Sequence, residues 1–305
     1  MSDDRQLPAP GEIFLDHVAW MVPDMDAASA AFTRLGFPLT PYSVHGDRNT
    51  ETGELVPTGS SNRLAMLPSG YLEILTTVEG VDTDLTRHLR GCIERHVGVH
   101  LVAFTVADAE AESERLKADG FEILPTVNLR RTIEAEDGSE VEVAFTVIRA
   151  RFGSIPEGRI QTIAHHTPEH MWQGRYIAQD NGIHGLTEVV FAVDDPAASA
   201  GRLARFTQRP SREGEAGPSI ALDRGRLRFL TPDAIAQAYD GLPAPAPPSV
   251  AALAFSSADM GKTRAFLEAS GIRPLADAAD RIVIGPDDGL GVGLVVSPRG
   301  SGGGA

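Results

Sequence analysis

Four segments of the chain repeat one pattern of hydrophobic and polar positions. In each, a short apolar stretch is followed by an acidic turn and then by an amphipathic stretch, over residues 15–37, 99–121, 186–206 and 250–272. The apolar stretches are rich in β-branched and aromatic residues, which favours strands. The amphipathic stretches place apolar residues at three- and four-residue spacing, which favours helices. Each segment therefore predicts a strand that leads into a helix.

The boundaries of these predicted helices carry suitable residues. The residues that precede the helices are all aspartates: Asp24, Asp108, Asp195 and Asp259. An aspartate at a helix N-terminus accepts hydrogen bonds from free backbone N–H groups and favours the helix dipole. Glycines suited to a left-handed C-cap follow three of the helices: Gly36, Gly120 and Gly271.

After each helix, alternating apolar and polar residues flank a turn and predict a hairpin. The four predicted turns lie at residues 68–70, 136–139, 223–225 and 286–289. The repeated unit is thus one strand, one helix and about three antiparallel strands. Four such units predict an α+β protein made of two domains, each built from two paired units.

The spacing of the units also predicts where the domains begin and end. We expect a first domain over residues 13–175, a second over 184–297, and a break between His170 and Gly185. A proline-rich linker at 242–249 separates the third unit from the fourth. Residues 1–12 and 298–305 are polar or glycine-rich, and we expect them to be disordered.

The negative charge of the chain argues against some classes of binding partner. The formal net charge is −15, from 42 acidic and 27 basic residues, which disfavours nucleic acid and anionic membranes. No apolar stretch approaches the length of a membrane span, and the N-terminus lacks the features of a secretory signal. We therefore expect a cytoplasmic protein with a small-molecule substrate, and a homodimer is plausible.

The single cysteine, Cys92, limits the chemistry further. One cysteine permits neither a disulfide within the chain nor a thiolate metal cluster. It lies in RHLRGCIERH, a stretch with helical character, and we favour a packed thiol over a nucleophile.

Three short stretches resemble a known family. They are LDHVAWMV at 15–22, GSSNRLAMLPSGYLEIL at 59–75 and HHTPEHMW at 165–172. Together with the repeated unit, they resemble the glyoxalase-like branch of the vicinal oxygen chelate superfamily. The resemblance covers residues 13–205, whereas the fourth unit is supported by the repeat alone.

The resemblance implies a fold and a type of site. In that superfamily, two βαβββ units form one cupped sheet, so four units imply two cups. Metal ligands come from the first and last strands of each unit and face the cup. A divalent ion there keeps open positions that chelate two neighbouring oxygens of the substrate.

Two residues match ligand positions of the family. Strand alternation counted from Asp24 places His17 on one face with Ala19 and Met21, while the bulkier face packs on the helix. Glu73 lies among apolar residues, where a carboxylate is costly to bury unless it is paired or binds a metal. The alternatives are a structural histidine and an exposed strand glutamate. We expect His17 and Glu73 to bind the metal.

The identity of a third metal ligand depends on the register of two further strands. Counting back from Asp108 places Leu101, and not His100, opposite His17, and only a β-bulge would turn His100 inward. In the last strand of the second unit the register leaves Gln161, His165 and His166 open. The match to HHTPEHMW favours His165. A His/Glu/His set suits Zn²⁺, Mn²⁺, Fe²⁺, Co²⁺ or Ni²⁺.

The second half lacks such a ligand set. Its positions equivalent to His17 hold Glu188 and Ala252, and those equivalent to Glu73 hold Arg228 and a residue near Gly293. We expect this half to be structural or to form a wall or interface for the first half.

Other residues are candidates for substrate binding. Asn62 and Arg63 can orient an anionic or carbonyl group, and Tyr71 and Trp172 can line the pocket, although turn, edge or core roles suit them equally. Arg130 and Arg131 are more typical of a solvated face.

Three functions remain open. The first is a metal-dependent lyase or isomerase, in which Glu73 is a ligand or a base. The second is a non-haem iron oxygenase of the extradiol type. The third is a small-molecule binding or resistance protein without catalysis. Extradiol dioxygenases with four units carry their metal in the C-terminal pair, and this chain does not match that pattern. We favour the lyase or isomerase.

Overall fold

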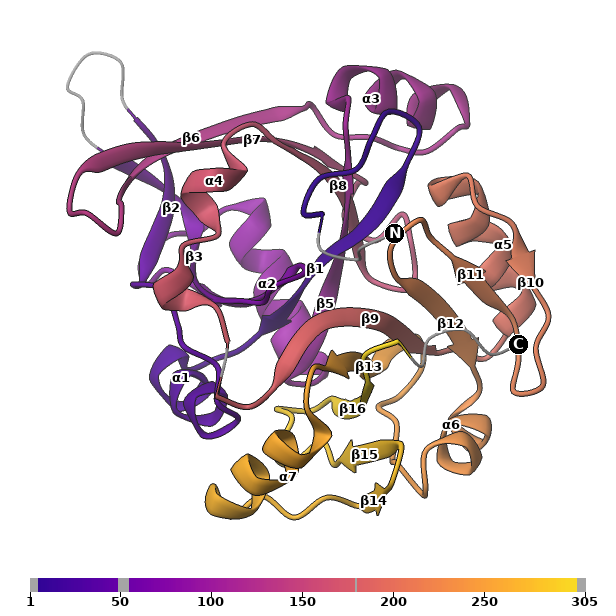
Figure 1. Ribbon diagram of the computed structural model, residues 1–305. Helices are drawn as coiled ribbons and strands as arrows, with labels where there is room; N and C mark the ends of the chain where they lie inside the picture. The colour runs from indigo at the N-terminus through magenta and orange to yellow at the C-terminus, as the bar shows by residue number, and fades with distance from the viewer. Residues whose placement is uncertain (1–4, 49–54, 179, 301–305) are drawn as a thin grey trace.

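Two curled eight-stranded sheets dominate the computed structural model, which describes residues 5–48, 55–178 and 180–300 (Figure 1). The strand order is β2-β3-β4-β1-β5-β8-β7-β6 in the first sheet and β10-β11-β12-β9-β13-β16-β15-β14 in the second. The two orders are equivalent, so each half of the chain forms the same kind of sheet.

The first sheet contains the strands up to residue 165. They are β1 (Ile13–Met21), β2 (Ser43–Arg48), β3 (Leu55–Met66), β4 (Tyr71–Thr77), β5 (Gly98–Val106), β6 (Val127–Glu134), β7 (Glu140–Arg149) and β8 (Arg159–His165).

The second sheet contains the strands from residue 183 onward. They are β9 (Ile183–Ala192), β10 (Ser211–Arg212), β11 (Ser219–Ala221), β12 (Arg226–Leu230), β13 (Ser249–Ser257), β14 (Ala276–Ala278), β15 (Arg281–Ile284) and β16 (Gly293–Pro298).

The helices lie between strands of the same half or in the connection between the halves. They are α1 (Met25–Arg34), α2 (Asp84–Arg95), α3 (Ala109–Ala118), α4 (Pro168–Met171), the 3₁₀ helix η1 (Gly174–Tyr176), α5 (Pro196–Thr207), α6 (Pro232–Ala238) and α7 (Met260–Ala269).

The helix starts are those that the sequence predicts. The aspartates at 24, 108, 195 and 259 are the N-caps of α1, α3, α5 and α7, and each carboxylate accepts a hydrogen bond from a first-turn backbone N–H. For example, Asp24 Oδ1 lies 2.9 Å from Asp26 N and 3.0 Å from Ala27 N. The four predicted strand–helix segments are therefore confirmed at the N-caps of their helices.

The pairing of strands confirms the tandem units. Strand β1 runs parallel to β4 and antiparallel to β5, and β5 in turn runs parallel to β8. The same pattern links β9, β12, β13 and β16 in the second half. Each sheet is thus two βαβββ units joined through their first strands. The prediction of an α+β protein with four units in two cupped sheets is confirmed.

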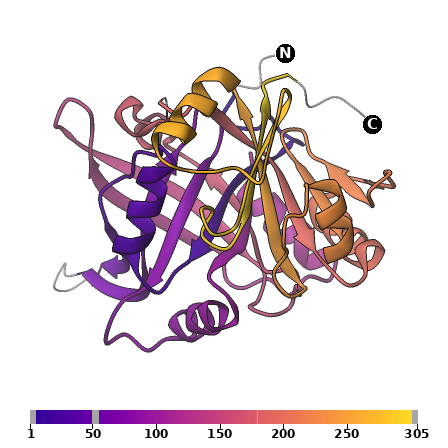
Figure 2. The same ribbon diagram turned by 90° about the horizontal axis from the view of Figure 1, so that it is seen from below.

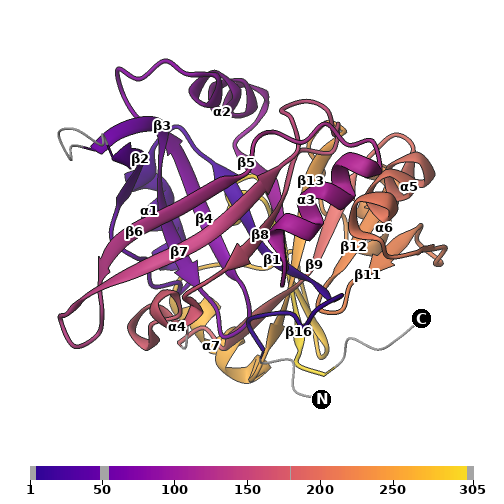
Figure 3. The same cartoon turned by 90° about the horizontal axis from the view of Figure 1, so that it is seen from above.

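The first sheet curls until its two edge strands approach each other. Viewed from above, β6 and β7 cross over the concave side of the sheet toward β2 and β3 (Figure 3). A hydrogen bond from Arg131 Nη1 to Ser43 Oγ, 3.1 Å long, joins β6 to β2. At one end of the cup, Leu89 of α2 packs with Met21 and Leu101. The concave side of the sheet is therefore an enclosed space and not an open face.

The faces opposite the two cups share one hydrophobic core. Val18, Trp20 and Phe104 of the first sheet belong to the same buried cluster as Val189 and Phe191 of the second. The indole N–H of Trp20 also donates to the carbonyl of Gly289, 3.1 Å away. Figure 2 shows the resulting arrangement, in which the two sheets lie against each other in one body.

A hairpin turn of the second sheet lies against the first strand of the chain. The backbone N–H of Leu15 donates to the carbonyl of Arg224 (2.8 Å), and Arg224 Nη2 donates to the carbonyl of Leu15 (3.1 Å). Gly225 adopts a φ of +95°, and a Cβ there would lie 2.6 Å from Leu15 Cβ. Only glycine suits both the conformation and this close approach.

The ends of the chain differ in part from expectation. Residues 5–12, expected to be disordered, are held by contacts: Gly70 N donates to Gln6 Oε1 (3.2 Å), and Arg5 pairs with Glu12 (3.0 Å). Residues 1–4 and 301–305 lie outside the described part. Within residues 5–48, 55–178 and 180–300, no helix is long and apolar enough to cross a membrane.

One ion pair between the halves is buried on the carboxylate side. Glu157, which precedes β8, is 2% exposed, and Arg202 of α5 contacts both of its oxygens at 3.0–3.3 Å. A buried carboxylate without its partner is strongly destabilising, because its charge is no longer compensated.

We expect Arg202→Ala to lower the free energy of unfolding by about 3 kcal/mol, because Glu157 then stays buried without a partner. Urea unfolding followed by circular dichroism measures the change. Adding Glu157→Gln to Arg202→Ala removes both charges and should recover more than half of the loss. A double variant no more stable than the single one would contradict this account.

Candidate functional site

The cup of the first sheet contains a cavity of about 770 Å³. Its lining includes residues from every strand of the sheet and from α2. The polar and charged ones with a part in the argument below are His17, His45, Asn62, Tyr71, Glu73, Arg131, Arg149, Arg159 and Gln161. A cavity of this size is in the range that holds small-molecule ligands.

A β-bulge at the start of the cup places two consecutive side chains on its concave side. Leu15 pairs with Phe104 and His17 pairs with Ala103, so Asp16 is an extra residue in β1. Bulges of this kind redirect side chains. Here the bulge allows both Asp16 and His17 to contact residues of the cup.

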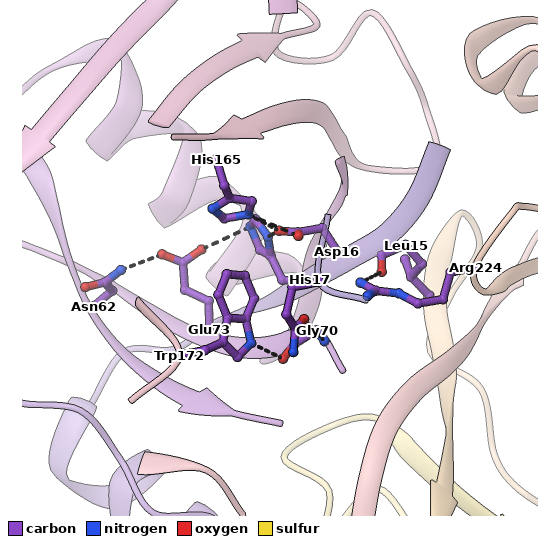
Figure 4. A network of polar contacts seen from close by, with 10 residues as sticks. Leu15, Asp16, His17, Asn62, Gly70, Glu73, His165, Trp172 and Arg224 are labelled. Carbon is purple, nitrogen blue, oxygen red and sulfur yellow. Dashed lines mark hydrogen bonds and ion pairs between the residues drawn. The ribbon is translucent and has the colours of Figure 1, made fainter. Parts of the chain in front are cut away.

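A chain of polar contacts runs through the site (Figure 4). The Asp16 carboxylate lies 2.6 Å from His17 Nδ1 and 3.1 Å from His165 Nε2. On its other side, His17 Nε2 lies 3.8 Å from Glu73 Oε2. Asn62 Nδ2 donates to Glu73 Oε1 at 2.7 Å. The order is therefore Asn62, Glu73, His17, Asp16 and His165.

The Asp16 carboxylate has no solvent exposure. Burial alone would raise its pKa, but the charge of His165 and the hydrogen bonds from His165 and His17 bring the pKa below its ordinary value. Asp16 is therefore ionised at neutral pH and acts as an acceptor for both imidazoles.

The contact with Asp16 fixes the orientation of His17. Because Nδ1 faces a carboxylate at 2.6 Å, it carries the proton, and the Nε2 lone pair faces the cup. The Tyr71 ring stacks on the imidazole with 4.2 Å between ring centroids. Burial raises the pKa of the Tyr71 phenol well above 10, and the nearby Asp16 and Glu73 carboxylates add to this shift. Tyr71 thus stays protonated beside His17.

Trp172 lies behind this cluster and not among the cavity-lining residues. Its ring meets those of His165 and Tyr71 edge-on, with centroids 5.1 and 5.9 Å apart. The indole N–H donates to the carbonyl of Gly70 at 3.4 Å. Trp172 therefore supports the site residues through packing.

Strand register identifies the counterpart of Glu73 in the second unit. Glu73 pairs with Ala19, and Gln161 pairs with Ala103, the residue that matches Ala19 in the repeat. Gln161 thus occupies the equivalent position on β8. Its Oε1 atom is buried and has no hydrogen-bond partner within the described chain.

The donor set available to a metal is small. In the described residues, no group of three His, Cys, Asp or Glu side chains lies close enough to hold an ion. His17 Nε2, Glu73 Oε2 and Gln161 Oε1 line the same cavity, and Leu101 at the fourth position has no donor atom. Three protein ligands with an open position are the usual arrangement of a catalytic metal, so these residues fit a divalent ion. The unpartnered Gln161 oxygen is the observation that supports this fit.

The two other expected histidine ligands lie elsewhere. His165 faces Asp16 through Nε2 instead of facing Glu73, because Gln161 occupies the register position expected for it. His100 is the extra residue of a second bulge, between Val99 and Leu101, but it does not line the cavity: its Nε2 lies 2.8 Å from the carbonyl of His96 and its Nδ1 lies 3.0 Å from Arg95, at the end of α2. His166, also left open, contacts Thr146.

The expected substrate-binding arginine also lies outside the cup. Arg63 pairs in register with Ile74, a core residue of the opposite face, and its Nη1 donates to the carbonyl of Thr40 at 3.4 Å. Arg131, by contrast, was expected on a solvated face but lies inside the cup. The solvated-face interpretation holds for the exposed Arg130 but is wrong for Arg131, which lines the cavity because β6 curls over it.

His45 lines the cavity and was missed from the sequence. Its Nδ1 lies 2.8 Å from Ser60 Oγ, and burial lowers the pKa of its imidazole, so it is neutral at pH 7. The sequence signal around it, SVHGD, is short and lacks clear alternation.

Cys92 is half-buried in α2, and burial raises the pKa of its thiol, consistent with a packed residue.

The second cup is filled instead of hollow. Side chains of α6, among them Ile235 and Tyr239, pack with residues of its concave face in one buried cluster. At the position of His17, Glu188 contacts Arg228 Nε and Tyr239 Oη, both at 3.1 Å. A structural ion pair therefore replaces the His17–Glu73 arrangement in this half.

Comparison with protein families gives one match. A family described as a glyoxalase-like domain matches residues 15–207, which include all of the first cup except the first two residues of β1. No curated protein matches the sequence.

Solved structures share the fold at low sequence identity. A hypothetical protein from Staphylococcus aureus has a TM-score of 0.63 at 11% identity and covers 94% of this chain and 99% of its own. A variant of 4-hydroxymandelate synthase from Streptomyces coelicolor has a TM-score of 0.58 at 16% identity, covering 96% and 95%. A fusion of a xylose isomerase-like TIM barrel with 4-hydroxyphenylpyruvate dioxygenase has 0.57 at 14%, covering 99% of this chain and 52% of its own.

His100 makes stability depend on pH. Burial lowers the pKa of its imidazole to about 4 from 6.5, so between these values the unfolded chain binds a proton that the folded chain does not. The free energy of unfolding should therefore fall as the pH drops from 6.5 toward 4. We expect His100 to contribute about 2 kcal/mol of that loss between about pH 7 and 5. Urea unfolding of wild type and His100→Gln measures it, and equal pH slopes in both would refute the assignment.

Proposed function

The chain belongs to the glyoxalase-like domain family of the vicinal oxygen chelate superfamily, and from this membership we propose that it is a metal-dependent lyase or isomerase. Its substrate is a small carbonyl or hydroxy compound, and the reaction moves a proton on the carbon next to the carbonyl group. The site is the cup of the first sheet.

One observation carries this proposal: Asp16, His17 and Glu73 lie in line at the wall of a cavity. A carboxylate that orients a histidine, which in turn faces a second carboxylate, supplies a fixed imidazole and a proton acceptor side by side. Proton transfer by a positioned carboxylate contributes about 10²–10⁴-fold to a rate. The arrangement thus suits acid–base chemistry on a bound small molecule.

A divalent ion held by His17, Glu73 and Gln161 would supply Lewis-acid stabilisation of negative charge on the substrate oxygen. The carboxylate of Asp16 then serves as the outer partner of the histidine ligand, an arrangement that fixes the imidazole and raises its basicity.

The other residues have roles that follow from their contacts. Asn62 donates to Glu73 Oε1 at 2.7 Å, so Oε2 is the oxygen that would bind the ion or, when released from it, accept the substrate proton. Tyr71 retains its phenolic proton and can donate it in a hydrogen bond to a substrate oxygen. The walls of the cup, closed by α2 and by the contact between Arg131 and Ser43, limit the access of water.

The two other functions have less support. An iron oxygenase of the kind considered from the sequence needs two histidines and one carboxylate. Among the described residues, His17 is the histidine in ion-pair contact with Glu73, while His45, which also lines the cavity, is bonded to Ser60. The neighbours named as a synthase and a dioxygenase fusion share the fold at 16% and 14% identity. A binding protein without catalysis accounts for the cavity but not for the ordered contacts of Asp16.

We expect His17→Ala to abolish divalent-metal binding, and Asp16→Asn to weaken it by about 10–100-fold, since outer partners of histidine ligands have effects of that size. Equilibrium dialysis against Mn²⁺ and Zn²⁺ measures both, with circular dichroism as a check on folding. His88→Ala is the control, because His88 stacks on Phe152 and does not line the cup. Unchanged metal content in His17→Ala would remove the basis for the metal site.

We expect Glu73→Gln to slow proton exchange about 10²–10⁴-fold, because glutamine keeps the shape and the contact with Asn62 but cannot accept a proton. The assay follows deuterium incorporation next to the carbonyl of 2-hydroxy and 2-keto compounds by NMR. Glu142→Gln, an exposed carboxylate paired with Arg130, is the matched control. If wild type exchanges no compound but consumes oxygen with catechols, the oxygenase function replaces this one.

A further inference from the structure

Three arginines face the cavity from one part of the first sheet. Arg131 lies on β6, Arg149 ends β7 and Arg159 begins β8, and all three line the cup. In register, Arg149 pairs with Gln161, and Arg159 lies two residues before Gln161 on the same face of β8. The Arg149 and Arg159 side chains thus lie beside the position that is equivalent to Glu73, whereas Arg131 pairs with Val143, six residues from Arg149 on β7.

These arginines have few partners in the described part of the chain. The Nε atoms of all three are buried without a hydrogen-bond partner in the described chain. Arg131 donates to Ser43, and the Arg159 guanidinium lies 5.5 Å from the Phe152 ring centroid. Within the described residues, neither Arg149 nor Arg159 forms an ion pair, whereas Arg130 next to Arg131 pairs with Glu142 at 2.6 Å.

The charge of the cavity is unusual for this chain. Glu73 is the one carboxylate among the lining residues that the structure describes, although the chain as a whole carries −15. Four arginines line the cavity, of which Arg130 is exposed and paired with Glu142, so three guanidinium groups have no carboxylate partner in the described chain. The Nε atoms of Arg149 and Arg159 are both buried without a partner in the described chain, so the two neighbouring charges are partly desolvated. Two partly desolvated like charges destabilise each other unless an anion lies between them.

We propose that Arg149 and Arg159 form a subsite for the oxyanion group of the ligand, a carboxylate or a phosphate. The guanidinium fork matches both groups, since it donates parallel hydrogen bonds to two oxygens. This proposal rests on the proposed function, because it names the substrate of the same cup: a small organic anion.

The register also sets the scale of that anion. Residues two apart on a strand are separated by about 7 Å, so the subsite lies about that far from Gln161 along β8. A ligand that spans this distance places its oxyanion group between the arginines and its reacting carbon near Glu73. Arg131, on the edge strand β6, lies farther along the cup, beside Ser43 of β2.

The test measures binding to the metal-free protein and does not require turnover. The probes are succinate and inorganic phosphate, titrated by calorimetry into wild type, Arg149→Met and Arg159→Met. We expect wild type to bind at least one probe and each variant to bind it at least 10-fold more weakly. Whichever probe binds more tightly identifies the oxyanion group. Arg151→Met is the matched control and should bind as wild type does, because Arg151 is exposed, pairs with Glu122 and does not line the cavity.

Folding and catalysis are separated by two further measurements. Arg159→Met should keep or raise the melting temperature, because it removes a desolvated charge that has no partner. Glu73→Gln should lose proton exchange but keep the affinity for the probe, so the subsite can stand even if the proposed reaction fails. Binding of neither probe by wild type, or equal affinity in the arginine variants, would overturn the subsite.

Discussion

The site depends on a carboxylate that has no contact with solvent. Burying the Asp16 charge is costly unless hydrogen bonds and opposite charge compensate it. His17 and His165 supply the hydrogen bonds, and His165 supplies the charge. These two histidines come from β1 and β8, strands of different units. The compensation of one charge therefore ties the two units of the cup together. It also sets the direction in which His17 faces the cavity.

The cavity is polarised as a consequence. Asp16 and Glu73 lie with the histidine near β1 and β4, whereas Arg149 and Arg159 lie near β7 and β8. A molecule with one anionic end and one polar reacting end has a single favourable orientation in such a field. The filled second cup, where Glu188 and Arg228 neutralise each other, has no comparable separation of charge.

The fold and half of the site follow from local patterns in the sequence. Strand alternation and the aspartate caps are properties of neighbouring residues, so the four units, the two cups and the inward face of His17 could be predicted. Asp16 could not, because it faces the cup only through a bulge, which breaks alternation. The choice of His165 over Gln161 failed to match the register, since the Thr-Pro used for alignment lies beyond the end of β8. Arg131 depends on the curl of a whole sheet, which no local pattern encodes.

The hairpin between β11 and β12 gives the second half a structural role, because its turn supports the first strand of the chain. Its turn is bonded to the backbone of Leu15, the residue before the bulge, and Gly225 leaves no room for any side chain there. The geometry of the working cup is thus maintained by a segment that contributes no atom to it. A side chain at position 225 would therefore have to displace the backbone that leads into the bulge of Asp16. The first cup accordingly depends on contacts with the second sheet, and the two sheets act as one structural unit.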